Sequence, residues 1–227
     1  EAAHSSRAIV SILQSALGTF GLPEKGVQLV EPLDREAVGI FLRMPEWIDA
    51  AIPRGGESLI RRVVEEARMP VIKHYKGVCH VFVDGEADLK MAEDIVMNAK
   101  CQRPGVCNAM ETLLVDKAIA PIFLPTVVSR LAEKQVELRV DAASETILQS
   151  KASDSKTKIR RATEQDWFTE YNDYVLNVRV VDGVKSAVAH INHYGSAHSD
   201  SIVTKNEARA QSPERRHRPE ESCFELV

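Results

Sequence analysis

Residues 78–83 read Val-Cys-His-Val-Phe-Val, a short apolar run that predicts a buried β-strand. Helical spacing of apolar residues follows at 89–99, and residues 112–115 then read as another buried strand. A helix between two buried strands is typical of a parallel sheet whose connecting helices cover both of its faces. This stretch therefore predicts an α/β fold.

The same alternation extends in both directions along the chain. Upstream, we expect strands at 27–30, 48–52 and 70–72, with helices at 9–17, 34–42 and 58–67. Downstream, we expect strands at 136–140, 174–181 and 201–204, with helices at 121–134, 142–149 and 184–191. The polar stretch 150–158 reads as a surface loop, and the polar, arginine-rich stretch 208–227 reads as a disordered tail.

Composition limits the class of protein and its partners. The chain has 227 residues, of which 44% are hydrophobic, so it can bury the core of one large domain or of two modest ones. Its formal net charge is -4, which gives no electrostatic reason to expect nucleic acid or an anionic membrane as a partner. No apolar run approaches the roughly 20 residues that span a bilayer, and the first residues do not read as a signal peptide.

The four cysteines are Cys79, Cys101, Cys107 and Cys223, and none of them forms a C-x-x-C pair. A chain of this size does not need disulfides for stability, so we interpret them as thiols in a reducing compartment, the cytoplasm. Cys107 follows Pro104-Gly105 in a loop between a predicted helix and a predicted strand. Such a loop can expose a nucleophilic thiol with Asn108 beside it, although a buried structural cysteine is the plain alternative.

Arg54-Gly55-Gly56 lies between a predicted strand and a predicted helix. Ligands of parallel sheets bind at the carboxyl ends of strands, and this turn is in that kind of position. Glycines there allow a phosphate to approach the backbone N–H groups of a helix N-terminus, although a tight turn without a ligand explains them equally well.

His190, His193 and His198 raise the question of a metal site together with Asp200. Their spacing matches no known set of zinc ligands, so we expect solvated or capping histidines and no metal. Cys79 and His80 are neighbours on a predicted strand, where successive side chains point to opposite faces, so we do not expect them to act as a pair.

Several segments together resemble the glutamate-5-semialdehyde dehydrogenase (γ-glutamyl phosphate reductase) family of the aldehyde dehydrogenase superfamily. The most specific is Asn98-Ala-Lys-Cys-Gln-Arg-Pro-Gly-Val-Cys-Asn-Ala-Met-Glu-Thr-Leu-Leu-Val115. The others are Ile52-Pro-Arg-Gly-Gly56, Pro70-Val-Ile-Lys-His-Tyr75, Gly77-Val-Cys-His-Val-Phe-Val-Asp84, Asp166-Trp-Phe-Thr-Glu-Tyr171 and Ala189-His-Ile-Asn-His-Tyr-Gly-Ser-Ala-His-Ser-Asp200. They follow the family's order over about nine tenths of the chain.

The resemblance implies a partial aldehyde dehydrogenase-like fold. Residues 1–87 would be the later part of an NADP-binding domain, 88–207 the catalytic domain, and 208–227 a tail foreign to the family. Cys107 matches the family's catalytic cysteine. Arg54, Gly55 and Gly56 match the turn near the cofactor, Glu1 the acid near the adenosine ribose, and Glu170 the acid near the nicotinamide ribose.

The implied activity is the NADPH-dependent reduction of L-glutamyl 5-phosphate to L-glutamate 5-semialdehyde, through a thioester on Cys107, in proline biosynthesis. The implied partners are this small-molecule substrate and, in the full-length family, identical subunits of an oligomer. Two alternatives remain open. The chain could be an inactive remnant of that enzyme, or an aldehyde dehydrogenase-type enzyme with another acyl substrate, which the Cys107 segment argues against.

The chain departs from the family's pattern at both ends. By this resemblance it begins inside the nucleotide-binding domain, and the match stops at about residue 207 in a way that suggests a shifted reading frame or a truncated gene. Within the match, Cys101 replaces the usual small hydroxyl residue, and Ala197 stands where the family usually has a glycine.

Overall fold

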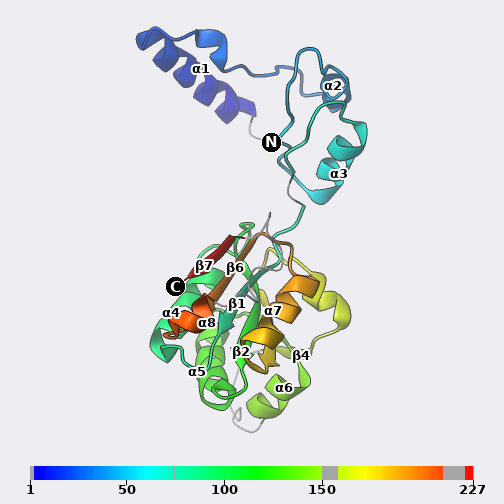
Figure 1. Ribbon diagram of the computed structural model, residues 1–227. Coiled ribbons are helices and arrows are strands. Elements are labelled where there is room, and N and C mark those ends of the chain that lie inside the picture. Colours follow the sequence, from blue (N-terminus) through cyan, green and yellow to red (C-terminus); the bar gives the residue numbers. More distant parts are fainter. Residues whose placement is uncertain (1–2, 74, 150–157, 212–222, 227) are drawn as a thin grey trace. The chain divides into compact units, whose positions relative to one another are not determined.

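The computed structural model describes residues 3–73, 75–149, 158–211 and 223–226 (Figure 1). The chain forms two compact units, Glu1–His74 and Tyr75–Val227. The domain boundary expected between residues 87 and 88 therefore falls inside the second unit. The reason is that the strand at residues 79–83 belongs to the same sheet as the strands that follow it.

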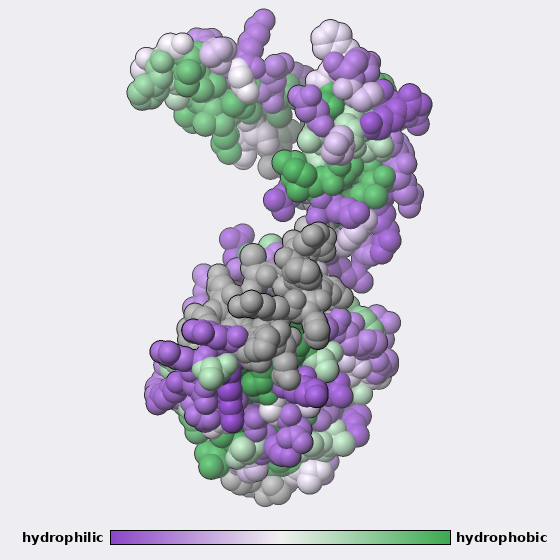
Figure 2. Space-filling model, viewed as in Figure 1, coloured by the Kyte–Doolittle hydropathy of each residue, from purple (hydrophilic) through white to green (hydrophobic). Residues whose placement is uncertain are grey.

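The first unit consists of helices and loops. Its helices are α1 (Ala3–Thr19), the 3-10 helix η1 (Glu24–Gly26), α2 (Glu36–Phe41) and α3 (Glu57–Glu66). A small core forms where Val63 of α3 packs with Leu42 and Met69. No residue of α1 is buried among the described parts of the chain, and Figure 2 shows its apolar surface.

The strands expected at 27–30, 48–52 and 70–72 do not form. Among the described residues of this unit, the β-structure consists of one isolated parallel bridge between Ala51 and Val71. A strand leaves its N–H and C=O groups unpaired unless another strand lies beside it, so an apolar run alone does not produce one. The expected helices 34–42 and 58–67 are confirmed as α2 and α3, and 9–17 lies within α1.

The second unit is built on a seven-stranded parallel sheet with the order β4-β3-β5-β2-β1-β6-β7. Its strands are β1 (Cys79–Val83), β2 (Met110–Asp116), β3 (Glu137–Val140), β4 (Ile159–Arg161), β5 (Val175–Val181), β6 (Ser199–Val203) and β7 (Cys223–Leu226). Every residue of β1 and β2 is buried, as expected for central strands of a sheet covered on both faces. The α/β fold class is confirmed.

Helices cover both faces of this sheet (Figure 1). The helices are α4 (Leu89–Cys101), α5 (Ala120–Glu133), α6 (Ala142–Gln149), α7 (Gly183–Tyr194) and α8 (Glu207–Ala210), with the 3-10 helix η2 at Glu164–Phe168. Residues of α4, α5 and α6 pack with Leu113 of β2, whereas α7 packs with Leu114, its neighbour on the strand. Alternate residues of one strand thus anchor opposite layers.

The end of the chain differs in part from the expected tail. Residues 223–226 form β7, which pairs in parallel with β6, and 207–210 form α8. Residues 212–222 and most of the expected loop at 150–158 lie outside the described residues. In the part of the chain that the structure describes, no helix is both long and apolar enough to cross a membrane.

Candidate active site

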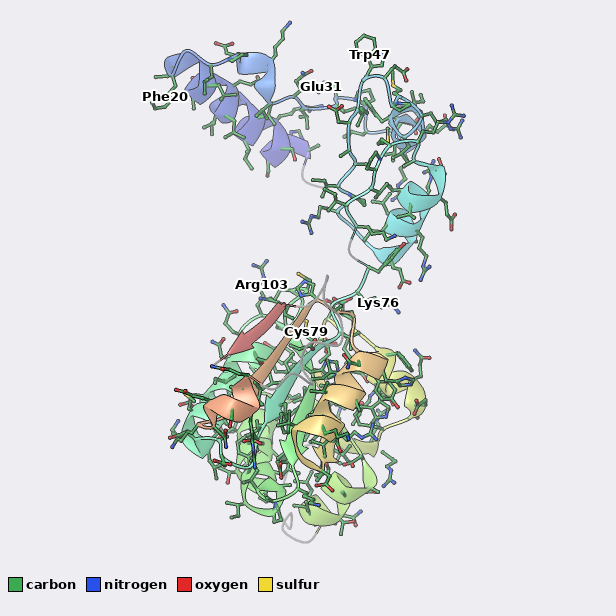
Figure 3. All side chains as sticks on the ribbon, viewed as in Figure 1. Phe20, Glu31, Trp47, Lys76, Cys79 and Arg103 are labelled. Atoms are coloured by element: carbon green, nitrogen blue, oxygen red, sulfur yellow. The ribbon has the colours of Figure 1, made fainter. Side chains whose placement is uncertain are left out.

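Cys107 is exposed and lies in the loop that joins α4 to β2. Hydrogen bonds from Val106 N to Arg103 O (3.4 Å) and from Ala109 N to Val106 O (3.0 Å) hold the turns of this loop. Figure 3 labels Arg103 on the same loop and Cys79 at the beginning of β1. Of the two alternatives left open for Cys107, the structure shows the exposed loop thiol and not the buried structural cysteine, while its catalytic role stays a prediction.

Gly77 brings the Cys107 loop and Glu170 to one place. A Cβ atom at residue 77 would overlap the backbone carbonyl of Cys107 and come within 2.9 Å of Glu170 Oε1. Because real Cβ atoms essentially never approach other atoms so closely, only glycine fits here. The two residues that the sequence analysis assigned to catalysis and to the nicotinamide end of the cofactor therefore both lie against one glycine.

These segments meet at the amino ends of the strands. Gly77 precedes β1, Cys107 precedes β2, Glu170 precedes β5, and His198 precedes β6. Open parallel sheets usually bind ligands at the opposite, carboxyl edge. That rule, applied above to the Arg54-Gly55-Gly56 turn, does not describe where Cys107 and Glu170 lie.

Cys79 contacts the backbone of the Cys107 loop. Its thiol donates to the Cys107 carbonyl oxygen at 3.3 Å and lies 3.7 Å from His198 Nδ1. Burial raises the pKa of Cys79 to about 12, so this thiol stays protonated and is a poor nucleophile. Burial also raises the pKa of Cys101, which is partly buried. Among the described thiols, the exposed Cys107 is the best placed to react.

Cys79 and His80 face different partners, as predicted for neighbours on a strand. His80 Nδ1 lies 2.8 Å from Asp200 Oδ1, and both side chains are buried. His190 is also buried, against the prediction that it is solvated or caps a helix, and its Nδ1 lies 2.9 Å from Arg179 Nη1. Burial lowers the pKa of His190 to about 2, so it is neutral and accepts the hydrogen bond from Arg179.

The described residues contain no group of three or more His, Cys, Asp or Glu side chains arranged to hold a metal ion. His190 instead packs edge-on against Trp167 and His80, with ring centroids 5.4 Å away in each case. His190 and His80 are therefore part of an aromatic cluster in the core.

The segment around Glu170 is fixed by a polar network centred on Asp166. Burial would raise the pKa of Asp166, but hydrogen bonds from Thr163, Arg139 and Tyr171 lower it to about 2, so the carboxylate is charged. The hydroxyl oxygen of Tyr171, which follows Glu170, also lies 2.9 Å from Asn177 Oδ1 on β5. Glu170 therefore lies in a segment whose next residue, Tyr171, contacts strand β5 of the sheet.

The Arg54-Gly55-Gly56 turn lies in the first unit, at the start of α3. Gly55 has a φ of 149°, and Gly56 is the N-cap residue of α3 without a side-chain cap. A Cβ at residue 56 would meet nothing within 4 Å, so the backbone here is open to a ligand. Glu1 lies outside the described residues.

Two features of the site were missed from sequence. One is the close packing at Gly77, and the other is a buried ion pair between Lys100 and Glu111, whose Nζ and Oε2 atoms are 2.8 Å apart. Both charged residues lie inside the segment used for the family resemblance. A lysine between the apolar residues Ala99 and Cys101, and a glutamate near the beginning of a buried strand, were the available signals.

No family model matches the chain. Among solved structures, it is similar to a gamma-glutamyl phosphate reductase from Thermotoga maritima, with 41% identity and a TM-score of 0.80 over 92% of this chain and 49% of that chain. A gamma-glutamyl phosphate reductase from Saccharomyces cerevisiae is 28% identical, with a TM-score of 0.50 over 97% of this chain and 52% of that one.

A more distant structure shares the fold. It is the NADP-dependent glyceraldehyde-3-phosphate dehydrogenase from Bacillus halodurans in complex with NADP, which is 20% identical with a TM-score of 0.62 over 83% of this chain and 46% of that one. This agreement confirms the expected partial aldehyde dehydrogenase-like fold. The chain spans about half the length of these proteins.

Proposed function

Because the chain belongs to the gamma-glutamyl phosphate reductase family, we propose that it carries the catalytic half of such an enzyme, with Cys107 as the nucleophile. The reaction is the NADPH-dependent reduction of L-glutamyl 5-phosphate to L-glutamate 5-semialdehyde. We also infer from the family that the enzyme acts in proline biosynthesis in the cytoplasm.

One observation carries the proposal. An exposed thiol sits in the family's most specific sequence segment, and Glu170 from a distant segment lies against the same glycine, Gly77. A nucleophilic thiol must be accessible and held in a fixed position, and both conditions are met at Cys107. A hollow of about 270 Å³ lies beside the loop and is lined in part by Arg103, Asn108 and Ser199.

The chemistry follows from a thiolate in this position. The sulfur of Cys107 attacks the acyl carbon, the bond from that carbon to the phosphate oxygen breaks, and inorganic phosphate leaves with the electron pair. A thioester remains on Cys107. NADPH, if bound, would supply the hydride that converts this thioester into the anion of a thiohemiacetal on Cys107. Cleavage of the carbon–sulfur bond then releases the aldehyde and restores the thiolate.

Phosphate is a good leaving group, so the site needs neither a strong general acid nor a base that activates water. The described residues around Cys107 are consistent with this chemistry. Cys79, which lies below the loop, is protonated and donates to a carbonyl oxygen, and His80 is engaged with Asp200. Glu170 is the carboxylate that lies against the same glycine as the Cys107 loop, and we assign it to the cofactor.

The first unit contributes residues that fit a nicotinamide dinucleotide. The open backbone at Gly56, at the N-terminus of the ten-residue helix α3, suits a phosphate group, and Arg54 adds a positive charge near it. We propose that the Arg54-Gly55-Gly56 turn and Glu1 contact the cofactor on the side away from the nicotinamide ring, while Glu170 contacts the nicotinamide ribose.

The reverse reaction tests the proposal. We expect the purified chain, given glutamate 5-semialdehyde, phosphate and NADP, to produce NADPH that is measured by its absorbance. Cys107→Ser should lower the rate by at least about a thousandfold, since a hydroxyl without an activating base is a weak nucleophile. Cys101→Ser, which removes a partly buried thiol six positions away in the same segment, serves as the matched control and should keep the rate.

Equal loss in both variants would contradict a specific role for Cys107. A rate that depends on Cys107 but appears with other aldehydes and not with glutamate 5-semialdehyde would favour the alternative of another acyl substrate. A folded chain with no measurable rate would favour the inactive remnant.

A further inference from the structure

Lys100 and Glu111 form an ion pair inside the second unit. Lys100 Nζ donates to Glu111 Oε2 at 2.8 Å, and both side chains are buried. Burial lowers the pKa of Lys100 and raises the pKa of Glu111, while the attraction between the two groups acts against both shifts. Lys100 lies in the last turn of α4 and Glu111 is the second residue of β2. The ion pair therefore links the two elements between which the Cys107 loop runs.

Glu111 also reaches a second segment. Its other oxygen, Oε1, accepts the backbone N–H of Asn172 at 3.3 Å, and Tyr171 contributes a further backbone hydrogen bond to the same carboxylate. Asn172 has a φ of 55°, in the left-handed region that asparagine tolerates better than most residues. A hydrogen bond to a buried carboxylate helps to hold this unusual conformation shortly after Glu170.

One carboxylate therefore joins the two segments that meet at Gly77. We propose that Lys100 and Glu111 are positioning residues, which hold the Cys107 loop and the Glu170 segment at a fixed distance from each other. This inference rests on the proposed role of Cys107, but not on any assumption about the substrate.

The location of the pair supports a positioning role over a purely stabilising one. Two apolar residues of similar size stabilise a protein core about as well as a buried ion pair does. Apolar side chains, however, cannot accept the N–H groups of residues 171 and 172, which would then lose their acceptor. The carboxylate of Glu111 accepts both of these N–H groups, and the ammonium group of Lys100 neutralises the negative charge of that carboxylate.

The reactivity of Cys107 with iodoacetamide, followed by mass spectrometry of the peptide that carries it, tests this proposal without substrate or cofactor. The rate is measured against pH in three backgrounds: the unchanged chain, Lys100→Met with Glu111→Gln, and Lys100→Met with Glu111→Leu. Both double variants remove the charges, but only the one with Glu111→Gln keeps an oxygen that can accept the N–H groups of 171 and 172. Each background is compared with and without Glu170→Gln.

We expect Glu170→Gln to shift the rate of Cys107 alkylation upward in the unchanged chain, because it removes a carboxylate that lies against the same glycine as the Cys107 loop. The double variant that carries Glu111→Gln should preserve this shift, since its amide oxygen still holds the Glu170 segment. The double variant that carries Glu111→Leu should lose it, since the Glu170 segment is then free to move away from Cys107.

An equal shift in all three backgrounds, or no shift in the unchanged chain, would overturn the proposal.

If the variant with Glu111→Leu fails to fold, as judged by circular dichroism, Glu111→Asp replaces it, because it keeps the charge but shortens the side chain by one methylene. The Glu111→Asp protein should show faster hydrogen exchange at the amide of Asn172 and a smaller Glu170 effect. Unchanged values for both would equally overturn the proposal. Loss of turnover in Cys107→Ser is a separate result, so the two proposals can fail independently.

Discussion

The two units of this chain deal with their apolar residues in opposite ways. In the second unit, Leu113, Leu114 and Val115 of β2 are completely buried between two layers of helices. In the first unit, Ile12 of α1 is 68% exposed and Trp47 is 78% exposed. Most of the other exposed large apolar residues among the described residues also lie in the first unit, namely Ile9, Leu13, Phe20, Leu22, Val30, Leu33, Ile40, Phe41, Ile52, Leu59 and Ile72, whereas Met91, Ile122 and Tyr174 lie in the second.

The difference teaches which sequence signals are local. Both units carry apolar residues at helical spacing, and both form helices at those positions. Short apolar runs became strands only in the second unit, where several of them lie beside one another in a sheet. Helical hydrogen bonds close within one segment, whereas a strand must find its partners elsewhere in the chain.

The strongest test of this contrast is to remove side-chain volume in each unit. Leu113→Ala should lower the free energy of unfolding by about 3 kcal/mol, because it leaves a cavity in a core with no exposed surface at that position. Ile12→Ala, the matched change on exposed α1, should alter it by less than about 0.5 kcal/mol. Urea unfolding followed by tryptophan fluorescence measures both.

The two tryptophans separate the units in this experiment. Trp167 is buried in the second unit and Trp47 is exposed in the first, so the fluorescence change should report mainly on the second unit. Trp47→Phe is the control that isolates this signal. A large effect of Ile12→Ala on the Trp167 transition would break the contrast, since it would mean that α1 contributes to the same core.

Acid should destabilise the second unit through His190. A histidine in the unfolded chain titrates near pH 6.5, whereas the pKa of buried His190 is lowered to about 2. Below pH 6.5 the unfolded chain therefore binds a proton that the folded chain does not, and stability falls as pH falls. The expected loss is about 2 kcal/mol between pH 6.5 and pH 5.

His190→Gln should flatten that pH dependence, because its amide oxygen can still accept from Arg179 but does not titrate. All described buried polar and charged side chains lie in the second unit, so the effect should follow the fluorescence of Trp167. The same slope in His190→Gln would mean that His190 is protonated in the folded chain.

The smallest expected effect concerns backbone conformation in each unit. Ala197 has a φ of 58°, in the left-handed region, which is the physical reason that glycine suits this position. Ala197→Gly should therefore stabilise the second unit by about 0.5–1 kcal/mol. Gly21→Ala, at a φ of 68° in the first unit with no atom near the new Cβ, should destabilise its surroundings by about 1 kcal/mol. Thermal unfolding by circular dichroism measures both. Opposite signs would contradict the assignment of strain to these two positions.

The candidate site was predictable where its signals are local. Cys107 follows a Pro-Gly turn between a helix and a strand, so an exposed loop thiol could be expected from the chain alone. The approach of Glu170 to Gly77 could not, because these residues are far apart in sequence and no local pattern encodes their packing. The burial of His190 was missed for the same reason, since a polar residue on a helix gives no sign of what covers it.

The sequence by itself determined helices α1 to α7, strands β1, β2, β3, β5 and β6, and the family to which the chain belongs, because periodicity and specific motifs are properties of consecutive residues. The tertiary structure alone decided which apolar runs became strands, at which edge of the sheet Cys107 lies, and which buried charge joins its loop to Glu170. These depend on contacts between distant segments, because a polar or charged group is buried at low cost only where another segment supplies its partner.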